Sequence, residues 1–107
     1  MLYQAFLNLL INAMQAMPDG GLISISVTAD WDDIWIVIDD EGEGIPEEIL
    51  QKIWDPFYTS KEKGTGLGLS IVKNIIEVHG GVISLENRSV DGAQARIRLP
   101  AKQQGKP

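Results

Sequence analysis

The sequence predicts an α+β fold, a two-layer α/β sandwich in which helices pack on one face of a mostly antiparallel sheet. Two observations carry this prediction. Helical and strand-like periodicities follow one another as helix, two strands, helix, two strands, and a short polar turn separates the strands of each pair. A length of 107 residues leaves room for one core. We therefore expect one domain over residues 1–101 and a polar tail over residues 102–107.

The first half of the chain predicts one helix and one hairpin. Residues 1–17 contain neither Gly nor Pro, and their apolar side chains recur at three- and four-residue steps, as in a helix. Pro and Gly in residues 18–21 then end this helix. Apolar and polar residues alternate over residues 22–28, which is typical of a half-buried strand, and residues 34–38 form a second, more continuously apolar strand.

The second half predicts two helices and another hairpin. A short helix starts at Pro46, and the two acids that follow lie near the positive end of its dipole. The next helix carries apolar residues at helical spacing and ends at Gly80 and Gly81. The predicted ranges are 46–53 and 69–78 for the helices, and 82–86 and 93–99 for the strands.

Composition excludes several classes of function. Fifteen acids against nine Lys and Arg give a net charge of −6, which argues against binding to nucleic acid or to an anionic membrane. The absence of cysteine excludes disulfides and thiolate zinc sites, and a single histidine, His79, excludes zinc sites that need two. No apolar run approaches the ~20 residues of a membrane span, and the N-terminus has no export signal.

Side-chain amides form the first pattern that could carry chemistry. They recur at spacings of four, four and three along the first helix, and so share one face: Gln4, Asn8, Asn12 and Gln15. Because their neighbours are almost all apolar, the buried members need polar partners. A neutral amide oxygen is a suitable ligand for Mg²⁺. The alternative is a solvated stripe or a polar link to a neighbouring element, and the stripe alone favours that alternative.

An acidic, glycine-containing segment follows the strand at residues 34–38. Asp40 at the strand end could accept a hydrogen bond from an exocyclic amine such as that of adenine. Gly42 and Gly44 would let the backbone approach a flat ring without a Cβ in the way. The alternative is an acidic turn that leads into the next helix.

A third segment places three glycines at alternate positions directly before the helix at residues 69–78. Backbone N–H groups together with a helix N-terminus can bind an anion, and Lys61 and Lys63 lie just upstream. A flexible linker is the alternative, but a linker would not run straight into an apolar helix. The spacing matches neither a P-loop nor a dinucleotide-binding fingerprint.

These segments together resemble the catalytic domain of sensor histidine kinases. In chain order they are similar to its N box, first glycine box, F box and second glycine box, at residues 8–13 (NLLINA), 40–46 (DEGEGIP), 55–61 (DPFYTSK) and 64–70 (GTGLGLS). Residues 71–81 and the closing Arg98–Pro100 also fit, so the resemblance spans nearly the whole chain.

The resemblance implies a GHKL ATP-binding fold, a two-layer α/β sandwich with a mixed, mostly antiparallel sheet and a mobile lid over the nucleotide. It implies that Asn12 holds Mg²⁺ on the phosphates of ATP with help from Asn8, and that Asp40 takes the adenine amine. The remaining nucleotide-binding residues would be Gly42, Gly44 and Ile45 beside the ring, Lys61 at the phosphates, and Phe57, Gly64, Thr65, Gly66, Leu67 and Gly68 in the lid.

The implied activity is transfer of the γ-phosphoryl group of MgATP to a histidine on a separate dimerisation domain of the same kinase, with a response regulator downstream. Hydrolysing relatives (gyrase, the heat-shock chaperone and mismatch-repair ATPases) carry Glu at the position of Asn8, and an amide is no general base. His79 precedes Gly80 at a helix end, where it suits the helix dipole better than the acceptor role. Two alternatives stay open: an anti-sigma-type serine kinase, or a nucleotide-binding module without turnover. We expect a cytoplasmic protein or the cytoplasmic part of a membrane sensor.

Two departures from the family pattern lead to further expectations. Family members usually carry Thr or Ser where this chain has Ala93, so the contact of that hydroxyl to adenine through water would be lost. The family's domain also begins upstream of the N box. We therefore expect an N-terminally truncated domain whose sheet exposes an edge.

Overall fold

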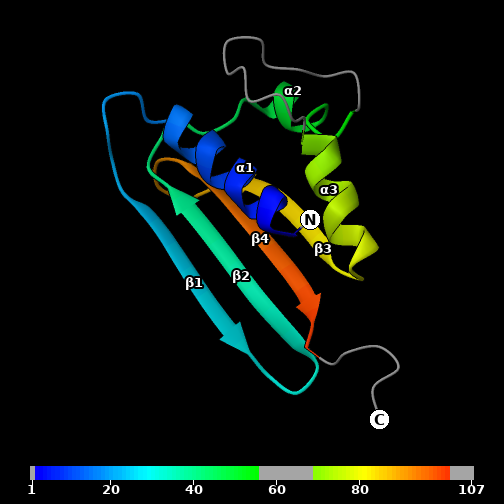
Figure 1. Cartoon of the computed structure of the whole chain (residues 1–107). Coiled ribbons are helices and arrows are strands. Elements are labelled where there is room, and N and C mark those ends of the chain that lie inside the picture. The colour runs from blue at the N-terminus through cyan, green and yellow to red at the C-terminus, as the bar shows by residue number, and fades with distance from the viewer. Residues whose placement is uncertain (1, 56–68, 102–107) are drawn as a thin grey trace.

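The computed structural model describes residues 2–55 and 69–101, and its elements follow in the predicted order (Figure 1). They are α1 (Leu2–Gln15), β1 (Ile23–Ala29), β2 (Asp33–Asp40), α2 (Glu47–Leu50), α3 (Leu69–Val78), β3 (Val82–Asn87) and β4 (Ala93–Pro100). No helix among the described residues has both the length and the apolar character that a membrane crossing requires.

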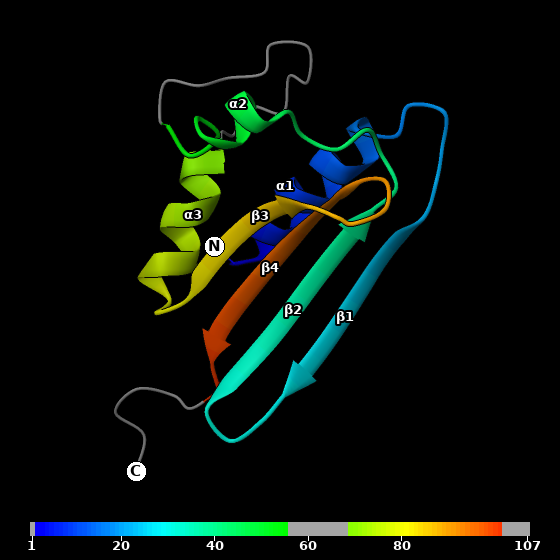
Figure 2. The ribbon, with the colours of Figure 1, turned by 180° about the vertical axis from the view of Figure 1, so that it is seen from behind.

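The four strands form one sheet in the order β1-β2-β4-β3, and all three pairings are antiparallel. β2 and β4 lie at the centre, where Ile38 pairs with Ala95. The helices lie together on one face of this sheet, and the view from behind shows the strands in front of them (Figure 2). The predicted α+β class and the two antiparallel strand pairs are confirmed.

The core lies between the sheet and the two long helices. Alternate strand residues point at the helices, so that Ile38, Ile83 and Ile97 meet side chains from α1 and α3 such as Leu9 and Ile76. Ile76 and Ile97 are fully buried. Burial of each such side chain stabilises the fold by about 1.5–3 kcal/mol.

The end of α3 follows the Schellman pattern that a Gly-Gly pair favours. The N–H of Gly81 donates to Ile76 O at 3.0 Å, and the N–H of Gly80 donates to Glu77 O at 2.9 Å. Gly80 has φ +80°, which a side chain would strain. The end that the sequence predicts is therefore confirmed.

The other two helices are shorter than predicted. α1 ends at Gln15, and the N–H of Met17 bonds the carbonyl of Met14 in a tighter turn. α2 covers only Glu47–Leu50, because the chain then continues through i→i−3 bonds rather than α-helical ones. Trp54, at the end of these turns, packs on the core, with Lys73 Nζ 5.5 Å from the centre of its ring.

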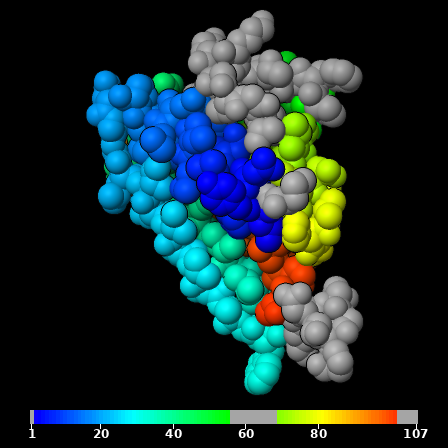
Figure 3. Space-filling model, in the orientation of Figure 1, coloured from blue at the N-terminus to red at the C-terminus, as the bar shows by residue number. Residues whose placement is uncertain are grey.

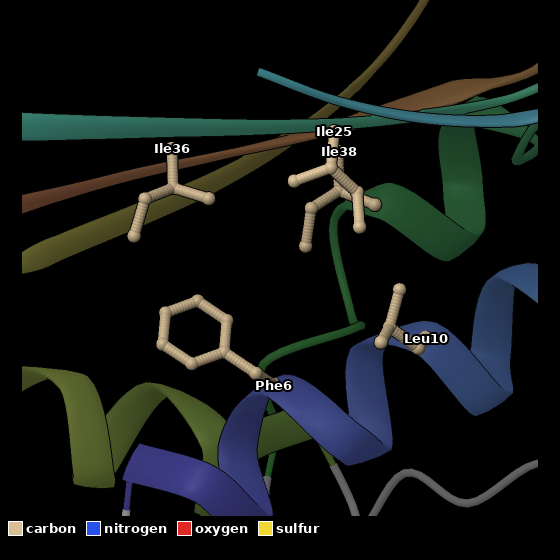
Figure 4. A pocket seen from close by; sticks show the side chains of 5 residues that line it. All are labelled: Phe6, Leu10, Ile25, Ile36 and Ile38. Carbon is tan, nitrogen blue, oxygen red and sulfur yellow. The ribbon is translucent and has the colours of Figure 1, made fainter. Parts of the chain in front are cut away.

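β1 lies at the edge of the sheet and is far more exposed than a half-buried strand. The strand forms where it was predicted, but the alternating burial is not observed: every residue after Ile23 is exposed, with Ile25 and Val27 at 54% and 63%. α1 lies over the middle of the sheet and leaves the part of β1 and β2 near their turn uncovered (Figure 3). An apolar groove of about 230 Å³ lies between α1 and the sheet and is lined by Phe6, Leu10, Ile25, Ile36 and Ile38 (Figure 4).

The turn between β1 and β2 is held by Asp30. Its Oδ1 accepts hydrogen bonds from the N–H groups of Asp33 at 2.8 Å and Asp32 at 2.9 Å. These two bonds, the one from Asp33 foremost, lower the pKa of the Asp30 carboxyl from its usual value of 3.8.

Candidate functional site

Asp40 is the last residue of β2, and strand alternation turns its side chain toward the helices. It is 7% exposed. Its Oδ1 accepts hydrogen bonds from the N–H of Gly42 at 2.8 Å and from the N–H of Ala93 at 3.2 Å. No described residue donates to Oδ2. The carboxylate is therefore fixed through one oxygen, and the other can accept a hydrogen bond from a ligand.

The loop after Asp40 lies against the C-terminal end of α1. A Cβ on Gly42 would come within 2.6 Å of Ala16 O, so only glycine permits this approach. The N–H of Glu41 also faces Met17 Sδ at 3.4 Å. Close helix–loop packing thus explains Gly42 without any ligand, and its place beside a flat ring stays a prediction.

The amide face of α1 points partly into the protein. Asn8 is 3% exposed, and none of the described residues bonds its Nδ2. Asn12 is half-buried, whereas Gln4 at the start of the face is exposed. Ala16 N–H donates to Asn12 O, so Asn12 lies one helical turn from the residue that touches Gly42. The buried amides and Asp40 are therefore on adjacent elements.

The described residues contain no cluster of three or more His, Asp or Glu side chains that could hold a metal ion. A cation in this part of the protein would depend on the amide oxygens of α1 and on oxygens of a ligand. Mg²⁺ is compatible with such a site, because it is commonly bound by few protein groups together with phosphates and water. The buried Nδ2 of Asn8, which none of the described residues bonds, also leaves a hydrogen-bond donor available on the amide face.

Seven of the predicted site residues lie outside the described residues: Phe57, Lys61, Gly64, Thr65, Gly66, Leu67 and Gly68. Gly44 and Ile45 are described and follow Asp40 in the loop, where Gly44 has φ +84°.

The turn between β3 and β4 contributes residues that the sequence analysis did not identify. Arg88 Nη1 donates to Asp40 O at 2.7 Å, and Asn87 bonds the backbone of Ile45. Gly92 has φ +98° and lies against Asp40 O so closely that a Cβ there would clash. The Asp-Gly pair at residues 91–92 is a turn signal that could have indicated Gly92. No local signal marks the other two.

Ala93 keeps a contact with Asp40 although it lacks the expected hydroxyl. Its backbone N–H bonds the carboxylate directly, and any residue at this position would retain that bond. His79 follows α3, with Nδ1 2.8 Å from Ile75 O, as expected for a residue at a helix end.

Comparison with known proteins identifies the class to which this fold and site belong. Residues 1–103 match the family model of the histidine kinase-, DNA gyrase B- and HSP90-like ATPases. The chain belongs to this family, whose domains bind ATP. Its fold and sequence are those of the catalytic, ATP-binding domain of two-component sensor histidine kinases.

Individual relatives narrow the position of the chain within this class. Sporulation kinase A of Bacillus subtilis (strain 168) is 48% identical over 101 residues, which make up 94% of this chain and 17% of that protein. The nucleotide-free catalytic domain of histidine kinase ThkA superposes with a TM-score of 0.81 at 41% identity, covering 91% of this chain and 64% of that one. Histidine kinase ThkA in complex with response regulator protein TrrA gives a TM-score of 0.77 at 35% identity, covering 96% of this chain and 29% of that one. The chain thus spans a small part of the curated relative.

Proposed function

We propose that this chain binds MgATP between α1 and the loop after β2, and presents its γ-phosphoryl group to a histidine on a separate dimerisation domain. The observation that carries the proposal is the buried carboxylate of Asp40, fixed through Oδ1 beside the amide helix. Its second oxygen would accept the exocyclic amine of adenine. Gly42, Gly44 and Ile45 would lie beside the ring.

The phosphates would lie toward α1. Asn12 would ligate Mg²⁺ through its amide oxygen, and the unbonded Nδ2 of Asn8 would donate to a phosphate oxygen or to a water bound to the ion. Bound Mg²⁺ would offset charge on the phosphates during transfer. We assign Lys61 to the phosphates and Phe57 to the lid, with Gly64, Thr65, Gly66, Leu67 and Gly68 as its nucleotide-binding backbone.

The amide of Asn8 favours transfer over hydrolysis. A general base must accept a proton from the attacking water, and a carboxamide does not do so at neutral pH. The chain would therefore hold ATP for an external nucleophile and hydrolyse it slowly. His79 lies at the end of α3, with Nδ1 2.8 Å from Ile75 O, and we assign it a structural role at the helix end rather than the acceptor role.

The partners follow from this reaction. The histidine would be supplied by the dimerisation domain of the same kinase, and a response regulator would take the phosphoryl group from it. The structure of histidine kinase ThkA in complex with response regulator protein TrrA supports a response regulator as the downstream partner. A domain that uses ATP in signalling would act in the cytoplasm, and we propose no contact of its own with nucleic acid or membrane.

A phosphotransfer assay tests the proposal. The chain is incubated with γ-labelled MgATP and the dimerisation domain of a related sporulation kinase, and the product is treated with acid. We expect label on the added domain that acid removes, because phosphohistidine is acid-labile. Acid-stable label would indicate a serine kinase instead, and binding of ATP without any transfer would indicate a module that lacks turnover.

A further inference from the structure

Asn87, the last residue of β3, holds the loop that follows Asp40 through its side-chain carboxamide. Asn87 Nδ2 donates to Ile45 O at 2.7 Å, and the N–H of Ile45 donates to Asn87 Oδ1 at 2.7 Å. One side chain thus bonds both polar groups of a backbone unit 42 positions away in sequence, much as a neighbouring strand would. No other described residue bonds these two groups of Ile45.

Gly44 is adapted to this contact. A Cβ at Gly44 would lie 2.9 Å from Asn87 Oδ1, and its φ of +84° disfavours any other residue. Because Gly44 has no side chain, the carboxamide of Asn87 can approach the loop backbone closely. Gly44 and Asn87 therefore act as one structural pair.

The adjoining β3–β4 turn also holds the start of the loop. Arg88 Nη1 donates to Asp40 O at 2.7 Å, and the N–H of Ala93 donates to the Asp40 carboxylate at 3.2 Å. The turn is therefore attached at both Asp40 and Ile45, the two ends of the segment that the proposed function assigns to adenine. Both attachments together hold the residues between Asp40 and Ile45 in place.

We infer that Asn87 is a positioning residue for base recognition: its two bonds to Ile45 hold the loop in the conformation that accepts adenine. This inference rests on the proposed function. Asn87 is exposed, and deletion of exposed hydrogen bonds changes folding little. Its loss would instead let the Gly44–Ile45 backbone move, and only a ligand that carries the base would detect that change.

The test compares two ligands in the full 107-residue chain. Calorimetry gives the Kd of MgATP and of magnesium tripolyphosphate for the unmodified protein, Asn87→Ala and Asn87→Asp. We expect Asn87→Ala to weaken MgATP about three- to tenfold, the effect of one typical hydrogen bond, and tripolyphosphate by less than about twofold. Asn87→Asp retains the acceptor for Ile45 N–H but places a carboxylate oxygen opposite Ile45 O, acceptor to acceptor, so we expect it to weaken MgATP at least as much as Asn87→Ala.

Asn74→Ala is the matched control, because Asn74 is an exposed asparagine on α3 with no bond to the loop. It should bind both ligands like the unmodified chain. Equal weakening of both ligands by Asn87→Ala, or none, would overturn the positioning role while leaving ATP binding in place. If the unmodified chain binds no MgATP, the proposed function fails and the inference fails with it.

Discussion

The substitution Asp40→Asn separates recognition of the base from recognition of the phosphates. An asparagine retains one side-chain oxygen, which can still accept from the N–H groups of Gly42 and Ala93. The other oxygen becomes an NH₂ group, which would face the adenine amine donor to donor. Because the two structural bonds survive, we expect the fold to persist and the loss to fall on the nucleotide.

The magnitude follows from the bond that disappears. A hydrogen bond to a charged group contributes about 1.5–3 kcal/mol, which corresponds to about 10- to 150-fold in Kd. Calorimetry should show this loss for MgATP and less than about a twofold change for magnesium tripolyphosphate. Asp39→Asn is the control, because it removes the same charge one residue away on the opposite face of β2. An equal loss for both ligands, or unchanged MgATP affinity, would refute the assignment of Asp40 to the base.

Further predictions concern the metal, the loop, the core and the turn. Asn12→Ala should weaken ATP about 10- to 100-fold with Mg²⁺ and little in EDTA, the range seen for groups that support a bound metal; an equal calorimetric loss in EDTA would contradict the metal role. Gly92→Ala should lower both Tm and MgATP affinity, because the added Cβ collides with Asp40 O at a φ of +98°; an unchanged Kd would count against the packing argument. Ile97→Ala should lower the free energy of unfolding in urea by about 2–5 kcal/mol, because Ile97 is fully buried; a loss below about 1 kcal/mol would contradict its place in the core. The Asp30 carboxyl should titrate by NMR below 3.8, since turn N–H groups favour its ionised form. Its contribution to stability is present above its unfolded pKa and is lost as pH falls through the lower folded one. Titration at or above the usual value would contradict the turn geometry.

Local patterns predicted the elements well, because each depends on residues near one another in sequence. Alternation placed the strands, and the Gly80–Gly81 pair fixed the end of α3 through bonds within six residues. The exposure of β1 was not predictable in the same way, because it depends on the order of the strands in the sheet, which places β1 at an edge.

The same distinction between local patterns and contacts of distant residues applies to the candidate site. Asp40 could be recognised from its place after an apolar strand and before two glycines. Asn87 could not, because its partner Ile45 is 42 residues away and an asparagine at a strand end is unremarkable by itself. The sequence explanation of Gly42 was also incomplete, since its close approach to Ala16 is a contact between distant elements.

An NMR titration of the ¹⁵N-labelled chain with three ligands tests most directly whether α1 and the loop after β2 form one nucleotide site. Adenosine should shift the backbone signals of Gly42 and Gly44, and magnesium tripolyphosphate should shift the side-chain amide signals of Asn8 and Asn12. MgATP should shift both groups along one binding curve with a single Kd. Two separate curves, or Asn12 signals that none of the phosphate-bearing ligands moves, would contradict the account.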